Sequence, residues 1–285
     1  MKPLAFLCVS LAAISFAQDK PVERTASLTG TIKYHHDFES KVRKNKRNIT
    51  VWLPPGYDAE PNGRYPVLYM HDGQNIFDGM TSYIPNKEWR VDECATGLIN
   101  AKLIEPIIIV GIDNAGMERG DEYLPIQITF GTTKTGGKAD EYGDMMMTEI
   151  MPMINKTYRT KTGAANTALC GSSFGGVITC DLGLKHTDAF SKLGIVSPSV
   201  WVGNRYLVDM VKKLPSKTNQ RVWIDMGTSE GMGAVKDCDA LAAAMRGKGW
   251  RDGKDLAYYV DGYALHNEEA WARRMNAILL FLYRK

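Results

Sequence analysis

The residues best suited to chemistry lie in the stretch ALCGSSFGGVITC at 168–180. Ser173 has Gly171 two positions before it and Gly175 two positions after it, and apolar runs flank the turn. This pattern is typical of a strand, a sharp turn and a helix, with a strained serine at the apex and no room for side chains beside it. Such a turn exposes a hydroxyl above a helix N-terminus that stabilises negative charge. We therefore predict that Ser173 is a nucleophile; a simple Gly/Ser-rich turn is the alternative.

A serine hydroxyl needs a base within hydrogen-bond reach, and His266 is the best candidate. It follows the last strand-like run and directly precedes the closing helix, where the base stands in the chain order Ser, acid, His. His71 also ends a strand but precedes Ser173, so we expect it to shape the loop beside the site and to contribute to substrate binding. The other histidines lie on or near the first strands or after the helix that follows the elbow, which is the sharp turn at Ser173: His35, His36 and His186.

The third member of such a site is an acid that orients the imidazole, expected in the loop after the penultimate strand. The run RVWIDM at 221–226 leads into GTSEG, which offers Glu230 beyond the strand end. Asp225 is still within the strand and should point elsewhere. Asp237 and Asp239 remain alternatives, although acids near the start of the next helix are favoured by its dipole.

Two backbone amides should hold the negative charge that develops on the substrate carbonyl. One is the amide directly after the nucleophile, that of Phe174. The other is expected from the loop HDGQ after the third strand, where we prefer Gln74 and keep Gly73 as the alternative.

The elements that must position these residues alternate between strands and helices. Most strand-like runs are apolar throughout, which is typical of a parallel sheet covered on both faces. Ligands of such sheets gather at the carboxyl ends of the strands, where Ser173 and the other polar clusters are expected. We predict an α/β fold in one domain, with strands at 26–34, 47–53, 65–70, 105–112, 167–170, 192–197, 221–226 and 256–260, and helices at 89–101, 142–158, 174–185, 237–248 and 267–283.

Two segments stand out from this alternation. Residues 113–143 are loop-rich, and a connection of this length in a compact domain is often a functional loop or lid. The basic cluster Lys41, Arg43, Lys44, Lys46 and Arg47 lies between the first two strands, and we interpret it as a solvated hairpin turn. The net charge of +3 is too small to indicate a nucleic acid as partner.

The first 17 residues have the pattern of a secretory signal peptide. Lys2 is followed by an apolar run at 3–16 and by the small-x-small sequence Ser15-Phe16-Ala17, so we expect cleavage before Gln18 and a mature domain at 18–285. Removal of this segment, whose one charged residue is Lys2, lowers the net charge to +2. The alternative is an N-terminal anchor. We predict a secreted or periplasmic protein with no membrane association in its mature form.

Four cysteines remain after such processing: Cys94, Cys170, Cys180 and Cys238. An exported compartment permits disulfides, and four cysteines allow three full pairings, between which the sequence does not decide. Cys170 ends an apolar strand and is expected to be a buried free thiol. The cysteines and histidines do not cluster at metal-ligand spacing, so no metal is predicted.

Six segments resemble the "Putative esterase" group of α/β-hydrolases, which includes feruloyl and acetyl-xylan esterases, enterochelin esterases, S-formylglutathione hydrolases and mycolyltransferases. They follow the family's order: VWLPPGYD at 51–58, YPVLYMHDGQNIFD at 65–78, GSSFGG at 171–176, SPSVW at 197–201, GTSEG at 227–231 and HNEEAW at 266–271. The resemblance implies an α/β-hydrolase fold, Ser173 as nucleophile, His266 as base, an acid at the GTSEG position and the Gln74 amide in the oxyanion hole. It also implies that Trp201 lines the acyl pocket or the wall opposite it, although a tryptophan packed in the core is the alternative.

These expectations combine into one hypothesis: a secreted serine carboxylesterase that uses no cofactor and cleaves a small-molecule or polysaccharide-linked ester of the feruloyl or acetyl type. A siderophore esterase of the enterochelin type and an acyltransferase are the alternatives with the same acyl-enzyme. A non-catalytic binding domain on the same fold is a further alternative, and it predicts an incomplete triad. The sequence does not indicate the acyl or alcohol specificity.

Overall fold

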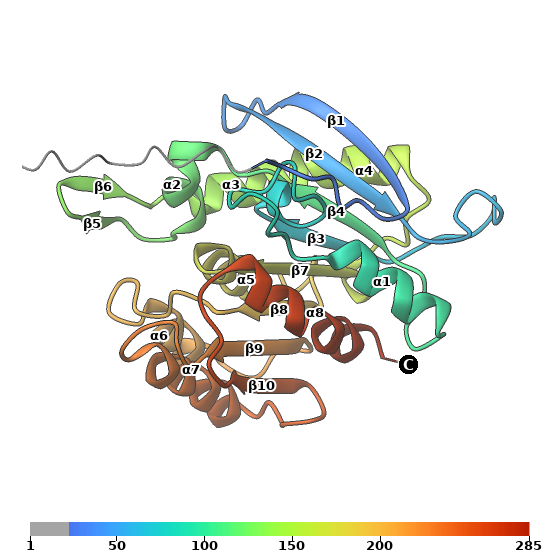
Figure 1. Cartoon of the computed structure of the whole chain (residues 1–285). Helices are drawn as coiled ribbons and strands as arrows, with labels where there is room; N and C mark the ends of the chain where they lie inside the picture. Colours follow the sequence, from blue (N-terminus) through green and yellow to red (C-terminus); the bar gives the residue numbers. More distant parts are fainter. Residues whose placement is uncertain (1–22, 285) are drawn as a thin grey trace, which may run out of the picture.

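An eight-stranded sheet forms the centre of the molecule (Figure 1). The computed structural model describes residues 23–284, so the predicted signal peptide lies outside the described residues. The strand order is β1-β2-β4-β3-β7-β8-β9-β10. The bounds are β1 (Thr31–Glu39), β2 (Lys46–Leu53), β3 (Val67–His71), β4 (Ile108–Ile112), β7 (Thr167–Ser172), β8 (Lys192–Val196), β9 (Arg221–Gly227) and β10 (Leu256–Asp261).

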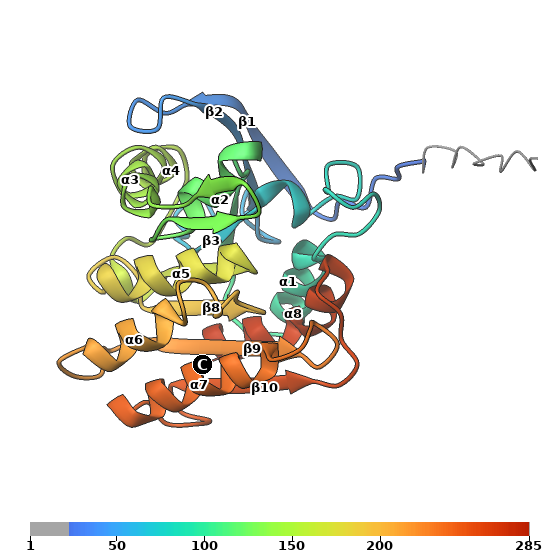
Figure 2. The ribbon, with the colours of Figure 1, turned by 90° about the vertical axis from the view of Figure 1, so that its left-hand side faces the viewer.

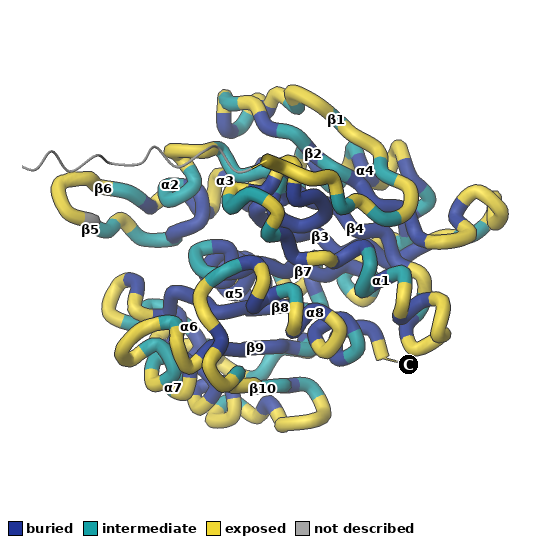
Figure 3. The backbone as a smooth tube through the Cα atoms, in the orientation of Figure 1, coloured by how far each residue is buried: buried dark blue, intermediate teal, exposed yellow. Residues whose placement is uncertain are grey.

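The sheet is parallel from β4 to β10, as the apolar runs predicted. The strands β1 and β2 pair antiparallel, and β2 pairs antiparallel with β4. Every residue of β3, β4 and β7 is buried, because both faces of these central strands are covered (Figure 3). The outer strand β1 is largely exposed, which fits its position at the edge of the sheet.

Helices cover both faces of the sheet (Figure 2). On one face, α1 (Val91–Asn100) and α8 (Glu268–Tyr283) pack on Leu68, Met70 and other side chains of that face. On the opposite face, Val67 and Tyr69 of the same strand belong to a second core. The helices that contribute to that second core include α3 (Ala139–Met145), α4 (Met151–Thr157), α5 (Phe174–Lys185), α6 (Tyr206–Lys213) and α7 (Ala234–Lys248). The predicted α/β architecture, a mostly parallel sheet with helices on both faces, is thereby confirmed for the described residues.

Several boundaries differ from the prediction. The first strand was expected at 26–34 but begins at Thr31 and ends at Glu39, because residues 23–30 run along the molecule and are held by contacts such as Trp52 Nε1 to Thr29 O at 2.9 Å. The helix expected at 142–158 is interrupted by a π-helical turn, Met146–Ile150, between α3 and α4. The short helix α6 was not predicted; it follows two residues with positive φ, Asn204 and Arg205.

The segment 113–143 contains more regular structure than a loop. A 3₁₀ turn (Gly116–Glu118) leads into α2 (Arg119–Tyr123), and the strands β5 (Ile128–Phe130) and β6 (Thr133–Thr135) form a separate hairpin. In Figure 1 this hairpin extends away from the main sheet, near the predicted catalytic edge.

The basic cluster at the β1–β2 turn is only partly solvated, which corrects the interpretation of a solvated hairpin. Lys41, Lys44 and Lys46 are exposed, but the side chains of Arg43 and Arg47 are 4% and 0% exposed. Both arginines bind the buried carboxylate of Glu122 from α2, at 2.9 Å and 2.8 Å. Burial alone would raise the pKa of Glu122, but the hydrogen bonds from Arg47 and Arg43 lower it below its ordinary value. The two arginines therefore fix α2 to the sheet.

The four cysteines of the described chain are free thiols, and Cys170 is buried as expected. Burial raises the pKa of Cys170 and Cys180, which keeps both as inert thiols. None of the helices within residues 23–284 combines the length and the apolar character that crossing a membrane requires.

Candidate active site

Ser173 stands at the turn between β7 and α5 with φ 59° and ψ −122°, a strained conformation for a residue with a side chain. The surrounding backbone holds this strain in place. The Ser173 amide donates to Val196 O at 3.1 Å, and its carbonyl accepts from the amides of Gly176 and Val177. A Cβ on Gly171 would lie 2.7 Å from Gly175 O, so a glycine is required there.

The Ser173 hydroxyl is half-buried at the carboxyl edge of the sheet. Its hydrogen-bond partner within residues 23–284 is the hydroxyl of Ser199, at 3.5 Å between the two oxygens. Ser199 is held in turn, because its amide donates to Ser173 O at 3.2 Å. The loop after β8 therefore carries a second hydroxyl beside the nucleophile.

His266 and Glu230 form a pair at the same edge, after β10 and β9. The distance from His266 Nδ1 to Glu230 Oε2 is 2.7 Å, and an ionised carboxylate makes Nδ1 the donor. The imidazole is 39% exposed, and its ring meets the ring of Trp271 edge-on, with centroids 5.1 Å apart. With Nδ1 as donor, Nε2 of the neutral ring is an acceptor and can take a proton.

The carboxylate of Glu230 is fixed on its other oxygen. Oε1 accepts from the Ser197 hydroxyl and from the Gly227 amide, each at 2.6 Å, and the buried guanidinium of Arg274 lies 3.6 Å away. Only 1% of the Glu230 side chain is exposed. Glu230 therefore presents a single oxygen to the imidazole, in one orientation.

The other acids considered for this position are engaged elsewhere. Asp237 accepts from Arg205 Nε at 2.8 Å, and Asp239 accepts from the Tyr258 hydroxyl at 2.7 Å. Asp225 accepts from Arg274 Nη1 at 2.8 Å. Of the candidate acids, Glu230 is the one that the structure brings to His266.

Two backbone amides lie where the predicted oxyanion hole is expected. Phe174 is the first residue of α5, so its amide has no partner within the helix and lies at the positive end of the helix dipole. Gln74 is the middle residue of the 3₁₀ turn Gly73–Asn75, which closes with bonds from Asn75 N to Asp72 O and from Ile76 N to Gly73 O. These bonds leave the Gln74 amide outside the pairing of the turn.

The turn that carries Gln74 is held tightly from two directions. Asp72, with φ 57°, binds the Arg119 guanidinium through both carboxylate oxygens, at 2.7 and 2.8 Å. Burial raises the pKa of Asp72, but its contacts with Arg119 and Asn114 lower it below the ordinary value, so the pair is ionised. On the other side, a Cβ on Gly73 would lie 2.5 Å from the backbone of Gly111 in β4. The position of Gln74 is therefore determined by packing.

The structure corrects the substrate-binding role expected for His71. This residue is 1% exposed and lies beneath the elbow, with its Nδ1 2.9 Å from the Tyr142 hydroxyl. Burial lowers the pKa of His71 to about 4, so the ring is neutral. His71 supports the elbow from below: a Cβ on Gly171 would lie 3.0 Å from its ring.

Trp201 lies beside the elbow and is 47% exposed, so it is not the core tryptophan that was the alternative. Its ring centroid is 6.3 Å from that of Phe174. The Arg119 guanidinium lies 5.4 Å from the same Phe174 ring. An aromatic surface with one cation therefore adjoins the nucleophile.

Two features of the site were not found from the sequence. Arg274 and Arg119 hold the acid and the oxyanion turn, but arginines in a helix and in a long loop carry no signal of such roles. The serines of SPSVW lie in a segment that the sequence did single out, and Ser197 and Ser199 form hydrogen bonds with Glu230 and Ser173, respectively.

Within the described chain, Ser173 and His266 are not joined by a hydrogen bond. Hydrogen bonds between a nucleophile and its base are often long in the free enzyme and tighten when substrate binds.

Most of the chain is similar in sequence to members of a known protein family. A family model described as "Putative esterase" matches residues 40–282. The "Uncharacterized protein YbbA" of Bacillus subtilis strain 168 is 23% identical over 256 residues, which cover 86% of this chain and 96% of that protein. The "Endo-1,4-beta-xylanase/feruloyl esterase" of Xylanibacter ruminicola is 30% identical over 218 residues, which cover 73% of this chain but 26% of that protein.

Solved structures share the fold at low sequence identity. The BES protein from Bacillus cereus has a TM-score of 0.70 at 19% identity, covering 94% of this chain and 100% of that chain. A ferulic acid esterase also reaches 0.70, at 20% identity, with coverages of 89% and 98%. The enterobactin esterase FES from Shigella flexneri, solved with enterobactin, reaches 0.68 at 17% identity, with coverages of 91% and 61%.

Proposed function

We propose that this protein is a secreted serine esterase that works through an acyl-enzyme. The chain belongs to the "Putative esterase" family of carboxylic ester hydrolases, and this membership is the basis of the proposal. The single observation that carries the catalytic assignment is the pair of His266 and Glu230, 2.7 Å apart, at the same sheet edge as the strained Ser173. The three residues come from loops after different strands, so only the fold brings them to one edge.

The proposed reaction has two halves. In the first, Ser173 Oγ attacks the ester carbonyl while His266 Nε2 takes the hydroxyl proton, and the amides of Phe174 and Gln74 hold the oxyanion. The imidazolium then gives its proton to the departing alcohol as the ester bond breaks. In the second half, His266 takes a proton from water, the resulting hydroxide attacks the acyl-serine, and Ser173 regains its proton as the free acid leaves.

The proposed substrate is the feruloyl or acetyl ester of a polysaccharide. The relative from Xylanibacter ruminicola is named "Endo-1,4-beta-xylanase/feruloyl esterase", and the region that matches this chain is 26% of its length. The half-exposed Trp201 beside Phe174 offers a flat apolar surface that suits an aromatic acyl group. The alternative is a catecholate siderophore ester, whose aromatic acyl group would suit the same surface of Trp201 and Phe174.

Secretion is part of the proposal and rests on the composition of residues 1–17. Expression of the full chain, fractionation of the culture and sequencing of the mature N-terminus test it. We expect an exported protein that begins at Gln18. A protein that keeps Met1 and stays in the cytoplasm would contradict this part of the proposal alone.

The decisive experiment is hydrolysis of a panel of feruloyl, acetyl, short p-nitrophenyl and catecholate esters by the wild type and Ser173→Ala. We expect a fluorophosphonate probe to label the wild type at Ser173 and to leave the variant unlabelled. Product analysis with added sugar acceptors separates the esterase from an acyltransferase, because an esterase releases only free acid. No labelling and no turnover of any ester would support the non-catalytic alternative.

A further inference from the structure

Three carboxyl groups meet at the start of α1, away from the site described above. Glu88 precedes the helix, and Asp92 and Glu93 stand in its first turn. One carboxylate oxygen of each lies within 4.8 Å of the others. Glu88 is 6% and Asp92 0% exposed, and the Glu93 side chain is 25% exposed.

Two oxygens of this cluster are buried without a partner. Asp92 Oδ2 accepts from the Thr29 amide at 2.6 Å, but Asp92 Oδ1 has no hydrogen-bond partner, and neither does Glu93 Oε2. A buried carboxylate oxygen without a partner is costly, and a second carboxylate beside it adds repulsion. Buried groups of this kind call for a cation or a donor between them.

Among residues 23–284, the two cations next to the cluster in sequence, Arg90 and Lys87, compensate it only weakly. Arg90 Nε is 3.8 Å from Glu93 Oε1, and the Arg90 side chain is 64% exposed, so the contact is weak. The Arg90 amide also donates to Glu88 Oε2, so Asp92 Oδ1 and Glu93 Oε2 are the oxygens of the cluster that lack a donor. Lys87, the next cation along the chain, is paired instead with Glu269 of α8, at 3.3 Å.

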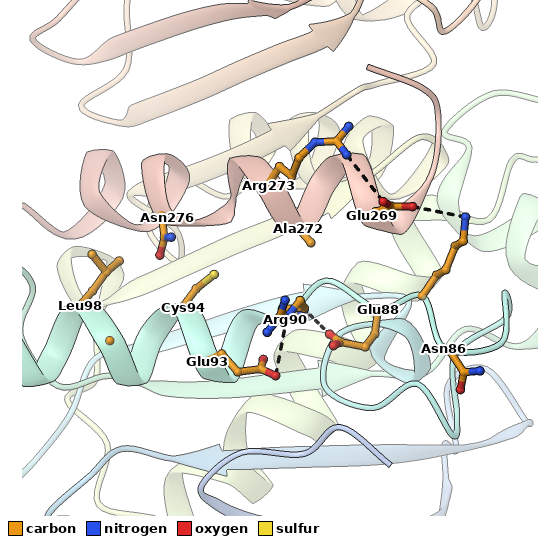
Figure 4. A pocket seen from close by; sticks show the side chains of 12 residues that line it. Asn86, Glu88, Arg90, Glu93, Cys94, Leu98, Glu269, Ala272, Arg273 and Asn276 are labelled. Carbon is orange, nitrogen blue, oxygen red and sulfur yellow. Dashed lines mark hydrogen bonds and ion pairs between the residues drawn. The ribbon is translucent and has the colours of Figure 1, made fainter. Parts of the chain in front are cut away.

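We propose that Glu88, Asp92 and Glu93 bind a hard divalent cation, with Ca²⁺ as the best match. Ca²⁺ takes six to eight oxygen ligands at about 2.3–2.6 Å, and carboxylates bind it through one or both oxygens. A groove of about 930 Å³ between α1 and α8 is lined by Glu88 and Glu93 and gives a route for the ion and its waters. Figure 4 shows these two side chains beside Arg90 at one end of that groove.

A cation at this position would join three parts of the chain. Asp92 holds the segment before β1 through Thr29. Trp89, between the ligands Glu88 and Asp92, donates its amide to Asn75 O at 3.0 Å, so the cluster is one hydrogen bond from the turn that carries Gln74. The ion would therefore stabilise the fold and steady this turn without touching a substrate.

Binding to the EDTA-treated full-length protein tests the proposal independently of any esterase activity. Calorimetric titration with CaCl₂ should give one saturable site, and the Tm should rise with the logarithm of the Ca²⁺ concentration, by roughly 5–10 °C at a hundredfold excess over Kd. Glu93→Gln and Asp92→Asn should abolish both effects. The matched control is Glu269→Gln, which removes one carboxylate from the same groove but outside the cluster and should bind as the wild type does.

The two cluster variants protect the test against misfolding. Glu93 is partly exposed, so Glu93→Gln should fold even if Asp92→Asn does not. The proposal is overturned if Ca²⁺, Mg²⁺, Mn²⁺ and Zn²⁺ all fail to bind saturably to the folded, EDTA-treated wild type. It is equally overturned if Glu93→Gln binds Ca²⁺ with unchanged affinity, because the ion then lies elsewhere.

Discussion

Replacement of Glu230 by glutamine removes one charge and keeps the shape of the side chain. In the proposed reaction His266 becomes a cation, and Glu230 Oε2 lies 2.7 Å from its Nδ1. Two unit charges at this distance attract by about 6 kcal/mol at an effective dielectric constant of about 20 and by about 1.5 kcal/mol in water. Because His266 is 39% and Glu230 1% exposed, we expect an intermediate value, about 3–4 kcal/mol.

This energy is lost mainly in the transition state, where the imidazolium forms. At about 1.4 kcal/mol for each factor of ten, kcat/KM of Glu230→Gln should fall roughly 10²–10³-fold. The loss should appear in kcat, because the ground state contains a neutral imidazole. The fold should survive, because Arg274 keeps its 2.8 Å ion pair with Asp225.

The assay is steady-state hydrolysis of a p-nitrophenyl ester, with circular dichroism and urea unfolding to verify the fold. Asp237→Asn is the matched control: it removes an acid that was an alternative from sequence but that binds Arg205 in the structure. This control should keep its rate within about twofold, since a surface ion pair contributes little. A folded Glu230→Gln with more than a tenth of the wild-type kcat, or a large loss in Asp237→Asn, would refute the assignment.

Three further outcomes follow from the geometry. Gly171→Ala places a Cβ 2.7 Å from Gly175 O and should lower the free energy of unfolding, measured by urea titration, by about 1–3 kcal/mol. The control Gly97→Ala lies in open space on α1 and should raise the free energy of unfolding by about 0.5–1 kcal/mol, and equal effects of the two substitutions would contradict the packing argument. Burial lowers the pKa of His71 from 6.5 to about 4, so the unfolded chain binds more protons at this residue between these values, and the contribution of His71 to stability should fall by about 3 kcal/mol as the pH drops through this window. Unfolding midpoints measured across the window should therefore show a smaller loss of stability toward low pH in His71→Gln than in the wild type, and identical pH profiles would contradict the argument. Arg47→Met should lower the free energy of unfolding by about 3 kcal/mol, because the buried negative charge of Glu122 then loses one of its two arginine partners. The control Lys44→Met, at the exposed part of the same turn, should change the free energy of unfolding by less than about 0.5 kcal/mol, and similar values for the two variants would argue against the buried ion pair.

The sequence predicted the parts of this fold that depend on short-range pattern. The turn around Ser173 was predictable because its glycines and the strand-turn-helix pattern allow few backbone conformations. The continuous apolar runs predicted a parallel sheet, since strands buried on both faces carry few polar residues. Those runs also placed His266 and the GTSEG loop after strands, and parallel strands end at the same edge.

Features that depend on long-range pairing could not be predicted in the same way. Arg43 and Arg47 look like solvated cations until Glu122, from a helix inside a loop-rich segment, is placed against them. His71 has the position of a site residue, but only the packing of Tyr123 and Tyr142 shows that its ring is enclosed. A single sequence contains no periodic signal that joins residues about 50 to 80 positions apart.

Arg274 shows why one acid of the β9 segment is available to the histidine and the other is not. Its guanidinium, 2% exposed, lies 2.8 Å from Asp225 and 3.6 Å from Glu230. If Glu230 were its only partner, the arginine would compete with the imidazolium for the same carboxylate. Asp225 neutralises Arg274 at the closer distance, so the charge of Glu230 stays directed at His266. Asp225 points away from the histidine, yet by neutralising Arg274 it allows the negative charge of Glu230 to stabilise the imidazolium of His266.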